Sequence, residues 1–217
     1  MEINERTTVV GGTCASLADA FYFDRPELRS AGFFTALRRY CREYRYNALV
    51  NFRLSQYAMA RRNELYNRLT DGAALSMARL FLAHPLRTLR MLAYSRIWDR
   101  CASQNIRRYL TNISALTEIG PGFSGMFLGV SMSAGVKVGK NANLSDYVVL
   151  ASHGTRAPVI GDNVQIWSSA VIVGGVAVGD NAVIAANALV VTDVPANSTV
   201  MGNPAKVVFR RKAPQTA

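Results

Sequence analysis

The sequence predicts an α+β protein in which an α-helical N-terminal domain is followed by a parallel β-helix of hexapeptide repeats. Two changes of pattern along the chain lead to this prediction. Up to about residue 110, apolar residues recur at intervals near 3.6, which is the period of an amphipathic helix. Beyond that point they recur every six residues, with glycine and asparagine between them, which is typical of a repeating strand-and-turn unit.

The helical domain is expected to span residues 1–110. The spacing predicts one long helix over Asn47–Leu69, and the helical pattern continues over Leu75–Ala93. Pro85 suits the first turn of a new helix, so His84 before it is expected to be a helix-start residue. Ser16–Tyr44 is expected to add two shorter helices, around Pro26 and Gly32.

The repeat domain is expected to span residues 111–209, with a basic tail at 210–217. One aliphatic row falls every six residues, at Ile160, Ile166, Ile172, Val178, Ile184 and Val190. A second row of small or aliphatic residues follows four positions later, at Val164, Ala170, Val176, Ala182 and Ala188. Three such units can close one triangular coil of about 18 residues, so roughly five coils are expected from Ile113 to Ala205.

The hexapeptide spacing slips twice. Ile119 and Val138 are one residue further apart than a multiple of six, and Leu150 and Ile160 are four residues too far apart. Both slips are expected to be loops that leave the coil.

The charge and cysteine content of the chain indicate which partners and which compartment suit it. The formal net charge is +11, and residues 1–110 carry 18 Arg and 9 acidic residues, a balance that suits anionic partners such as nucleotide phosphates, acidic polysaccharide or a membrane surface. Three separated cysteines suggest neither a disulfide framework nor a zinc site and fit a reducing cytosol. From the N-terminal residues and the lengths of the apolar stretches we expect neither an export signal nor a membrane span. The stretch from Leu75 to Trp98 is broken by arginines, so membrane contact is expected to be peripheral at most.

The repeat half resembles a known family. The segments IGDN, VAVGDNAVIAANALVVTDVP and MGNPAKVV are similar to the last coils and closing segment of the hexapeptide-repeat acetyltransferases, especially the serine acetyltransferases and the sugar O-acetyltransferases of polysaccharide clusters. The resemblance covers residues 112–209. It implies a left-handed β-helix, a homotrimer or dimer of trimers, and acetyl-CoA bound between neighbouring subunits.

In this family a histidine acts as general base on the acceptor hydroxyl, because a hydroxyl is too weak an acid to attack a thioester with its proton in place. Aligned with serine acetyltransferases, that histidine would stand at Met126, and Asn112 takes the place of the acid that orients it. Aligned with galactoside and colanic-acid acetyltransferases, the catalytic position falls on His153. His153 is therefore the candidate base, with an ordinary loop histidine as the alternative.

The resemblance also implies donor-binding residues. Ser168, Ala186 and Thr192 match positions that line the coenzyme A groove, and Lys206 with Arg210 matches the basic end that meets its phosphates. Trp167 is expected to point outward and either cover this groove or pack on a neighbouring subunit. Arg210 can equally belong to a solvated basic tail.

The sequence thus predicts a cytoplasmic, acetyl-CoA-dependent O-acetyltransferase acting on a saccharide or glycan precursor. Serine O-acetyltransferase is one alternative, and a catalytically silent trimeric binding or regulatory protein is another. A γ-class carbonic anhydrase needs three histidine ligands, and the chain has two histidines. Bifunctional nucleotidyltransferases carry a Gly-rich loop that residues 1–110 lack. We expect no metal and no nucleic acid partner.

Overall fold

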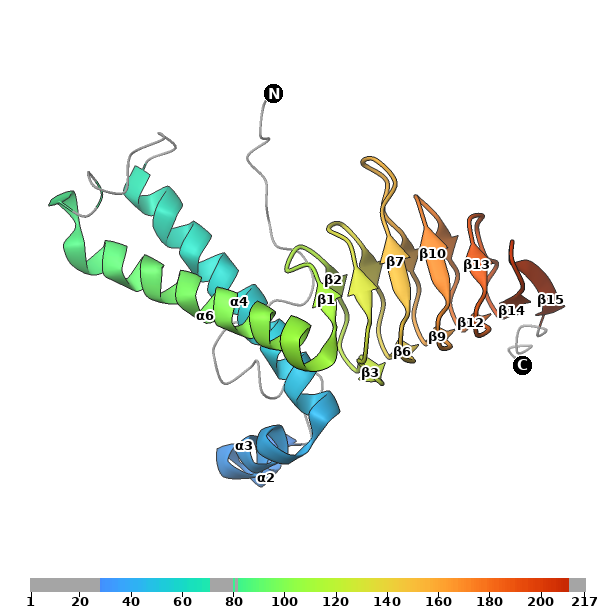
Figure 1. Ribbon diagram of the computed structural model, residues 1–217, viewed down its shortest axis with the longest axis horizontal. Coiled ribbons are helices and arrows are strands. Elements are labelled where there is room, and N and C mark those ends of the chain that lie inside the picture. Colours follow the sequence, from blue (N-terminus) through green and yellow to red (C-terminus); the bar gives the residue numbers. More distant parts are fainter. Residues whose placement is uncertain (1–27, 71–79, 81, 211–217) are drawn as a thin grey trace, which may run out of the picture.

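A computed structural model describes residues 28–70, 80 and 82–210, and it contains a helical part followed by a parallel β-helix (Figure 1). The main helices of the described chain are α2 (Leu28–Ala31), α3 (Phe33–Arg42), α4 (Tyr44–Thr70) and α6 (Pro85–Tyr109). Helix α4 extends a few residues beyond the predicted helix, and α6 begins at Pro85 with His84 directly before it. The helix expected around Pro26 and most of Leu75–Leu82 lie outside the described residues.

The strands form three sheets, one on each side of a triangular prism. Sheet A has the order β1 (Asn112–Ile113), β4 (Ser131–Met132), β7 (Val149–Ala151), β10 (Val171–Val173), β13 (Leu189–Val190). Sheet B has the order β2 (Glu118–Ile119), β5 (Lys137–Val138), β8 (Val159–Ile160), β11 (Ala177–Val178). Sheet C has the order β3 (Ser124–Gly125), β6 (Asn143–Leu144), β9 (Gln165–Ile166), β12 (Val183–Ile184), β14 (Ser198–Met201), β15 (Lys206–Arg210). The chain visits A, B and C in turn, which confirms the predicted stack of about five coils.

The two predicted apolar rows form the core of the β-helix. All members of both rows from Ile160 to Val190 are buried, and they belong to one continuous hydrophobic cluster. Equivalent residues of successive coils are parallel ladder partners, as in the pairs Ile166 with Ile184 and Ile172 with Val190. Because each coil buries its apolar side chains only against its neighbours, stacking supplies the hydrophobic stabilisation that a single coil lacks.

The edge between sheets B and C is held by an asparagine ladder. Asn141, Asn163 and Asn181 adopt φ values of 54–57°, a left-handed backbone that asparagine tolerates better than most residues. The side-chain amide of each donates to the side-chain oxygen of the next, at 3.2 Å, and Asn181 donates to Asn197 in the same way. The asparagines that recur in the repeat therefore both adopt the turn conformation and hydrogen-bond one coil to the next.

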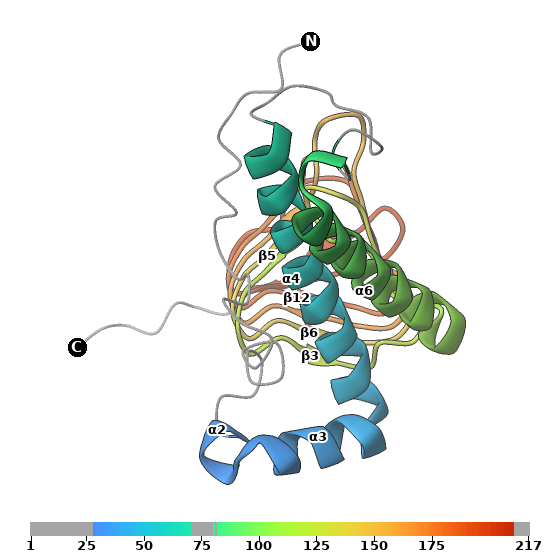
Figure 2. The same cartoon turned by 90° about the vertical axis from the view of Figure 1, so that its left-hand side faces the viewer.

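Helix α4 covers the open end of the first coil, where no earlier coil exists to pair with its carbonyl groups (Figure 2). The guanidinium of Arg53, which is fully buried, donates to the carbonyls of Ile119 at 3.1 Å and Gly120 at 3.3 Å. Gln56 donates to the carbonyl of Thr117 at 2.8 Å. Two polar side chains of α4 thus replace hydrogen bonds that the preceding coil donates elsewhere in the β-helix.

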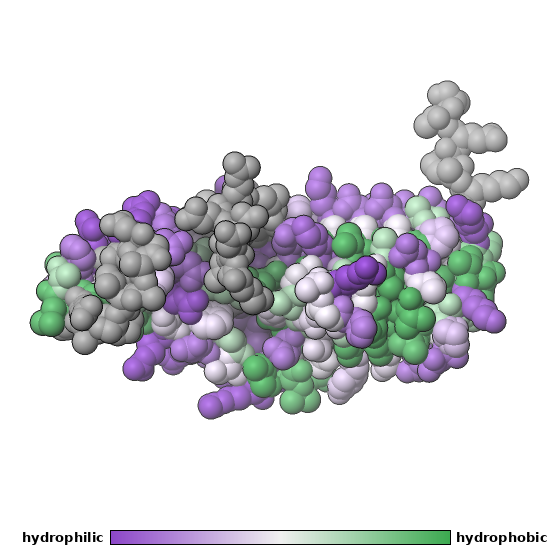
Figure 3. All heavy atoms as spheres, turned by 90° about the horizontal axis from the view of Figure 1, so that it is seen from above, coloured by the Kyte–Doolittle hydropathy of each residue, from purple (hydrophilic) through white to green (hydrophobic). Residues whose placement is uncertain are grey.

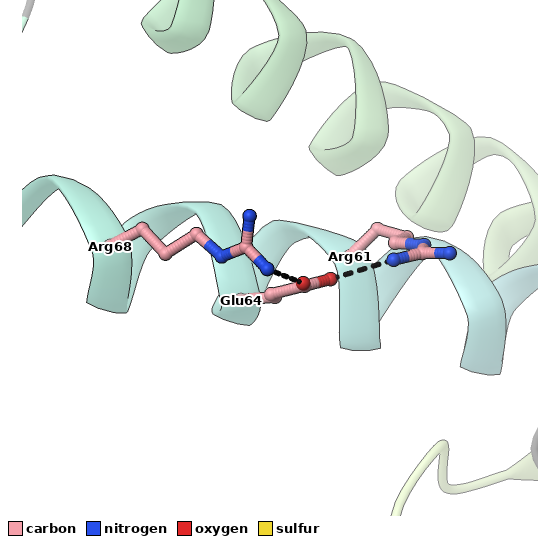
Figure 4. A network of polar contacts seen from close by, with 3 residues as sticks. All are labelled: Arg61, Glu64 and Arg68. Carbon is pink, nitrogen blue, oxygen red and sulfur yellow. Dashed lines mark hydrogen bonds and ion pairs between the residues drawn. The ribbon is translucent and has the colours of Figure 1, made fainter.

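Helices α4 and α6 form an antiparallel hairpin with its own polar and aromatic contacts. The amide of Asn105 donates to the carbonyl of Ala48 at 3.2 Å and accepts from Asn51 at 3.3 Å. Towards the far end, the guanidinium of Arg62 lies 4.9 Å from the ring centroid of Trp98. On the exposed side of α4, Glu64 accepts from Arg61 and Arg68, and these contacts lower the pKa of Glu64 (Figure 4).

The two slips in the repeat have different structures. The longer one, between Leu150 and Ile160, is a loop that leaves the coil, as expected. At the shorter one the expectation of an outward loop is wrong, because the additional residue packs inward. Phe127 is fully buried, and its ring lies 5.2 Å from that of Phe123, measured between centroids. Gly125 takes the register position of Leu144 and has no side chain, so the two phenylalanines supply the apolar volume there.

Candidate active site

The loop after β7 is a tight hairpin that carries His153. The backbone N–H of His153 donates to the carbonyl of Arg156 at 2.9 Å, and the N–H of Arg156 donates back at 3.2 Å. Gly154, at the tip, has a φ of 61°, which favours glycine. The hairpin rises above the neighbouring coils in Figure 1. Its backbone hydrogen bonds therefore hold His153 two residues beyond the end of β7, directly before the turn residues Gly154 and Thr155.

A pocket of about 320 Å³ lies beside this hairpin, at the edge between sheets A and B. Three successive coils line it, with His153 and Arg156 from the first, Val173, Gly174, Gly175 and Val176 from the second, and Val191, Thr192 and Asp193 from the third. Thr192 and Asp193 lie 39 and 40 residues beyond His153 in the sequence, and the coiling of the chain brings them to one site. The pocket is open to solvent and presents an imidazole, a guanidinium, a hydroxyl and a carboxylate.

Arg156 and Asp193 are each fixed by the coil beside them. The stem of Arg156 lies against Gly175, where an added Cβ would come within 2.9 Å of the Cβ of Arg156. A side chain at position 175 would therefore displace the arginine. The carboxylate of Asp193 accepts from the backbone N–H of Ala177 at 2.8 Å. Both charged groups consequently have a defined position on the wall of the pocket.

His84, the second histidine, lines a different pocket of about 290 Å³. Its described lining residues, Ala83, His84, Pro85, Leu86 and Arg87, come from a single stretch of sequence. Among the residues that the structure describes, this lining brings no acid, hydroxyl or second base to His84. Of the two histidines, only His153 lies in a pocket built by several coils.

The other predicted site residues lie elsewhere on the prism. Trp167, Ser168 and Ala186 occupy the edge between sheets C and A, and all three are exposed. Lys206 and Arg210 are exposed on β15, the antiparallel strand that pairs with β14 at the far end of the chain. Only Thr192 shares a pocket with His153. The structure therefore divides the predicted donor-binding residues between two edges instead of gathering them in one groove of a single chain.

Met126 and Asn112 also lie at the edge between sheets C and A. Met126 follows β3 and is 43% exposed, and Asn112 begins β1, where its N–H donates to the carbonyl of Val130 at 2.8 Å. Met126 precedes β4 and His153 follows β7, so the two alternative catalytic positions lie at opposite ends of the strands of sheet A. An assembly that used both edges at one site would have to combine them from two chains.

Two features of the pocket were not predicted as site residues. Arg156 faces the same pocket as His153 because the hairpin closes between them, and hairpin closure cannot be deduced from the six-residue period. Asp193 reaches the pocket from the third coil, and its role there depends on the stacking of the coils. Among the residues that the structure describes, no group of three or more His, Cys, Asp or Glu side chains could hold a metal ion.

Comparisons with known proteins agree with this architecture. Residues 157–192 match the family described as "Bacterial transferase hexapeptide (six repeats)". A serine acetyltransferase of Helicobacter pylori is 31% identical over 140 residues, which are 59% of this chain and 77% of that protein. A serine acetyltransferase of Synechococcus elongatus is 32% identical over 121 residues, which are 48% of this chain and 49% of that protein. The chain therefore spans about half the length of one such relative and about three quarters of the other.

Solved structures of serine acetyltransferases share the fold. One in complex with CoA superposes with a TM-score of 0.60 at 21% identity, covering 89% of this chain and 70% of that one. The Neisseria gonorrhoeae enzyme gives a TM-score of 0.57 at 23% identity, covering 91% of this chain and 69% of that one. Together with the helical N-terminal part and the coiled repeat, these comparisons show that the chain belongs to the hexapeptide-repeat acetyltransferase family.

Proposed function

We propose that this protein is an acetyl-CoA-dependent O-acetyltransferase with His153 as the general base. The observation that carries this proposal is the pocket in which His153 meets Arg156, Thr192 and Asp193 from three coils. Family membership supports acetyl transfer as the reaction. The position of His153 in a hydrogen-bonded hairpin supports its role, because a base has to be held at a fixed distance from the hydroxyl it deprotonates.

The chemistry requires two proton transfers and one acyl transfer. An unprotonated ring nitrogen of His153 accepts the proton of the acceptor hydroxyl while the hydroxyl oxygen attacks the thioester carbonyl. The C–S bond then breaks, and the thiolate leaves with a proton returned from the imidazolium. A single imidazole thus serves as base and then as acid, as is common for histidine.

Acetyl-CoA is expected to use the other edge of the prism. Trp167, Ser168 and Ala186 are exposed between sheets C and A, and Lys206 and Arg210 offer cationic groups at the end of the β-helix. Within one chain, this edge lies where the strands of sheet A begin, and His153 lies where they end. A trimer in which the donor edge of one subunit lies beside the hairpin of the next would bring thioester and base together.

Serine is the first acceptor to test. The two curated relatives compared above are named serine acetyltransferases, and so are the two solved structures. An amino-acid acceptor is also compatible with the charges in the pocket, since Arg156 can pair with a carboxylate and Asp193 with an ammonium group.

A saccharide hydroxyl is the second candidate. It is favoured by one observation, the presence of Met126 and Asn112 where the resemblance to serine acetyltransferases places a histidine and its orienting acid. With that pair absent, the known serine site would lack its base.

Calorimetric titration of acetyl-CoA into the full-length protein is the first test, because it does not depend on the acceptor. Binding in the micromolar range supports the proposal, and acetyl transfer to serine and to a panel of sugars is then measured by release of the free thiol. Turnover with one acceptor class identifies it. Binding without turnover on either class favours the catalytically silent protein, and no binding at millimolar acetyl-CoA excludes the transferase.

A further inference from the structure

Beyond the reaction at His153, helix α6 carries an outer face that the fold leaves uncovered among the described residues. Leu86 is 76% exposed and Leu89 is 50% exposed, and Leu82, just before the helix, is 83% exposed. At 100° per residue, Leu86, Leu89 and Ala93 fall within about 60° of one another on the helix surface. Thr88 and Met91, which are buried, lie on the opposite side towards α4.

Arginines border this apolar face on both flanks. Arg90 lies on one side of the row and Arg96 on the other, and both are exposed, as is Arg87. From Gly72 to Trp98 the sequence contains four arginines and no acidic residue. On the neighbouring helix α4, Glu64 is already paired with Arg61 and Arg68. Figure 3 shows hydrophobic and strongly hydrophilic side chains side by side at the outer end of the helical hairpin.

We propose that the outer face of α6, from Leu86 to Ala93 together with Leu82, docks on an anionic lipid surface. A helix with an apolar face and a basic border lies in the membrane interface, with its leucines at the boundary of the acyl chains and its arginines at the phosphates. None of the described helices is long and apolar enough to cross a bilayer, so docking is at the surface.

Charge argues for lipid over a second copy of the chain. Two copies meeting through this face would bring Arg90 and Arg96 close to the same arginines of the partner, and α6 as a whole carries six arginines against one acidic residue, Asp99. An anionic bilayer offers many negative charges to the same residues. The face therefore complements a phosphate-rich surface better than it complements itself.

The test uses the full-length protein and vesicles of phosphatidylcholine, with or without one quarter phosphatidylglycerol, in a flotation assay. We expect binding only to the anionic vesicles, and weaker binding as salt increases, because added ions screen the arginines. The double variant Leu86→Ser, Leu89→Ser is expected to weaken binding at least about tenfold. The double variant Arg90→Gln, Arg96→Gln removes the two flanking arginines and is expected to weaken binding about fivefold per arginine.

Matched controls lie at the other end of α6 and on the first coil. The double variant Arg107→Gln, Arg108→Gln removes the same charge about 20 Å further along the helix, about two screening lengths away, and should change binding less than twofold. Leu116→Ser removes an exposed leucine from the β-helix and should have no effect. Circular dichroism checks that each variant is folded.

Two results would overturn the proposal. One is equal binding by the α6 variants and the controls. The other is a wild-type protein that does not bind anionic vesicles, together with a smaller assembly mass in light scattering for the double variant Leu86→Ser, Leu89→Ser. That result would assign this face to contact between copies of the chain.

Discussion

His153 is positioned by its backbone, since both hydrogen bonds that close its hairpin are main-chain bonds with Arg156. Its side chain can therefore be removed without breaking the contacts that shape the loop. This makes the residue well suited to a functional test, because a loss of activity is not confounded by a loss of fold.

We expect His153→Ala to lower kcat for acetyl transfer by about 10²–10⁴-fold, the usual contribution of a general base, with little change in thermal stability. The measurement is thiol release at saturating acetyl-CoA. His84→Ala is the matched control, because it removes the other histidine from an exposed position before α6. Unchanged turnover in His153→Ala would assign catalysis to another group.

The two described cysteines differ in environment. Cys41 is exposed, whereas Cys101 is buried in α6, and burial raises the pKa of the Cys101 thiol from 9.0 to about 11. Since the folded protein holds this proton more tightly than the unfolded chain does, the associated stabilisation is complete below about pH 9. It is lost as the pH rises through about 11.

At pH 8 we expect iodoacetamide to modify Cys101 at least about a hundredfold more slowly than Cys41, because its thiolate is rare and its access restricted. Peptide mass spectrometry over a time course distinguishes the sites. In 8 M urea the two rates should become similar. Fast modification of Cys101 in the native protein would contradict its placement against α4.

At the scale of elements, the junction between α4 and the first coil depends on one buried charge. Arg53 donates to two carbonyls of the coil and to Gln56, and its guanidinium lies 5.3 Å from the ring centroid of Phe52. Removing the guanidinium would leave those carbonyls buried without a donor, which is costly in a region shielded from water.

Arg53→Met is therefore expected to lower the free energy of unfolding by about 3 kcal/mol. The same change in Arg68, whose pair with Glu64 is exposed on the same helix, should cost less than about 0.5 kcal/mol. Urea titration followed by circular dichroism measures both. Equal effects would mean that Arg53 contributes only as an exposed arginine does.

In the molecule as a whole, the stacked coils of the β-helix are structurally independent of the hairpin that carries His153. Each coil contacts mainly its neighbours, and the hairpin lies outside the regular coil. Leu150 and Ile160 are ten residues apart, so removing residues 153–156 restores the six-residue spacing of the repeat.

We expect this deletion to give a folded β-helix with a melting temperature within a few degrees of the wild type and without detectable acetyl transfer. Circular dichroism melting and the thiol-release assay measure the two properties. Loss of folding would show that the hairpin is structural, and retained turnover would remove His153 and Arg156 from the site.

The predictable parts of the fold are those that depend on local repetition. The row from Ile160 to Val190 is buried as its spacing predicts, because a six-residue period fits a strand-and-turn coil. The start of α6 at Pro85 follows from a single residue that favours the first helical turn. Phe127 was missed, because its inward packing depends on the space that Gly125 leaves in the same coil.

The candidate site was only partly predictable. The coil, its inward rows, its asparagine edge and the place of His153 in a loop follow from the sequence alone. The stacked structure is needed to show that His153 shares a pocket with Arg156, Thr192 and Asp193, while Trp167, Ser168 and Ala186 lie on another edge. The physical reason is that a period fixes the direction of each side chain within a coil, whereas the neighbours of a site depend on how the coils stack and where the hairpin closes.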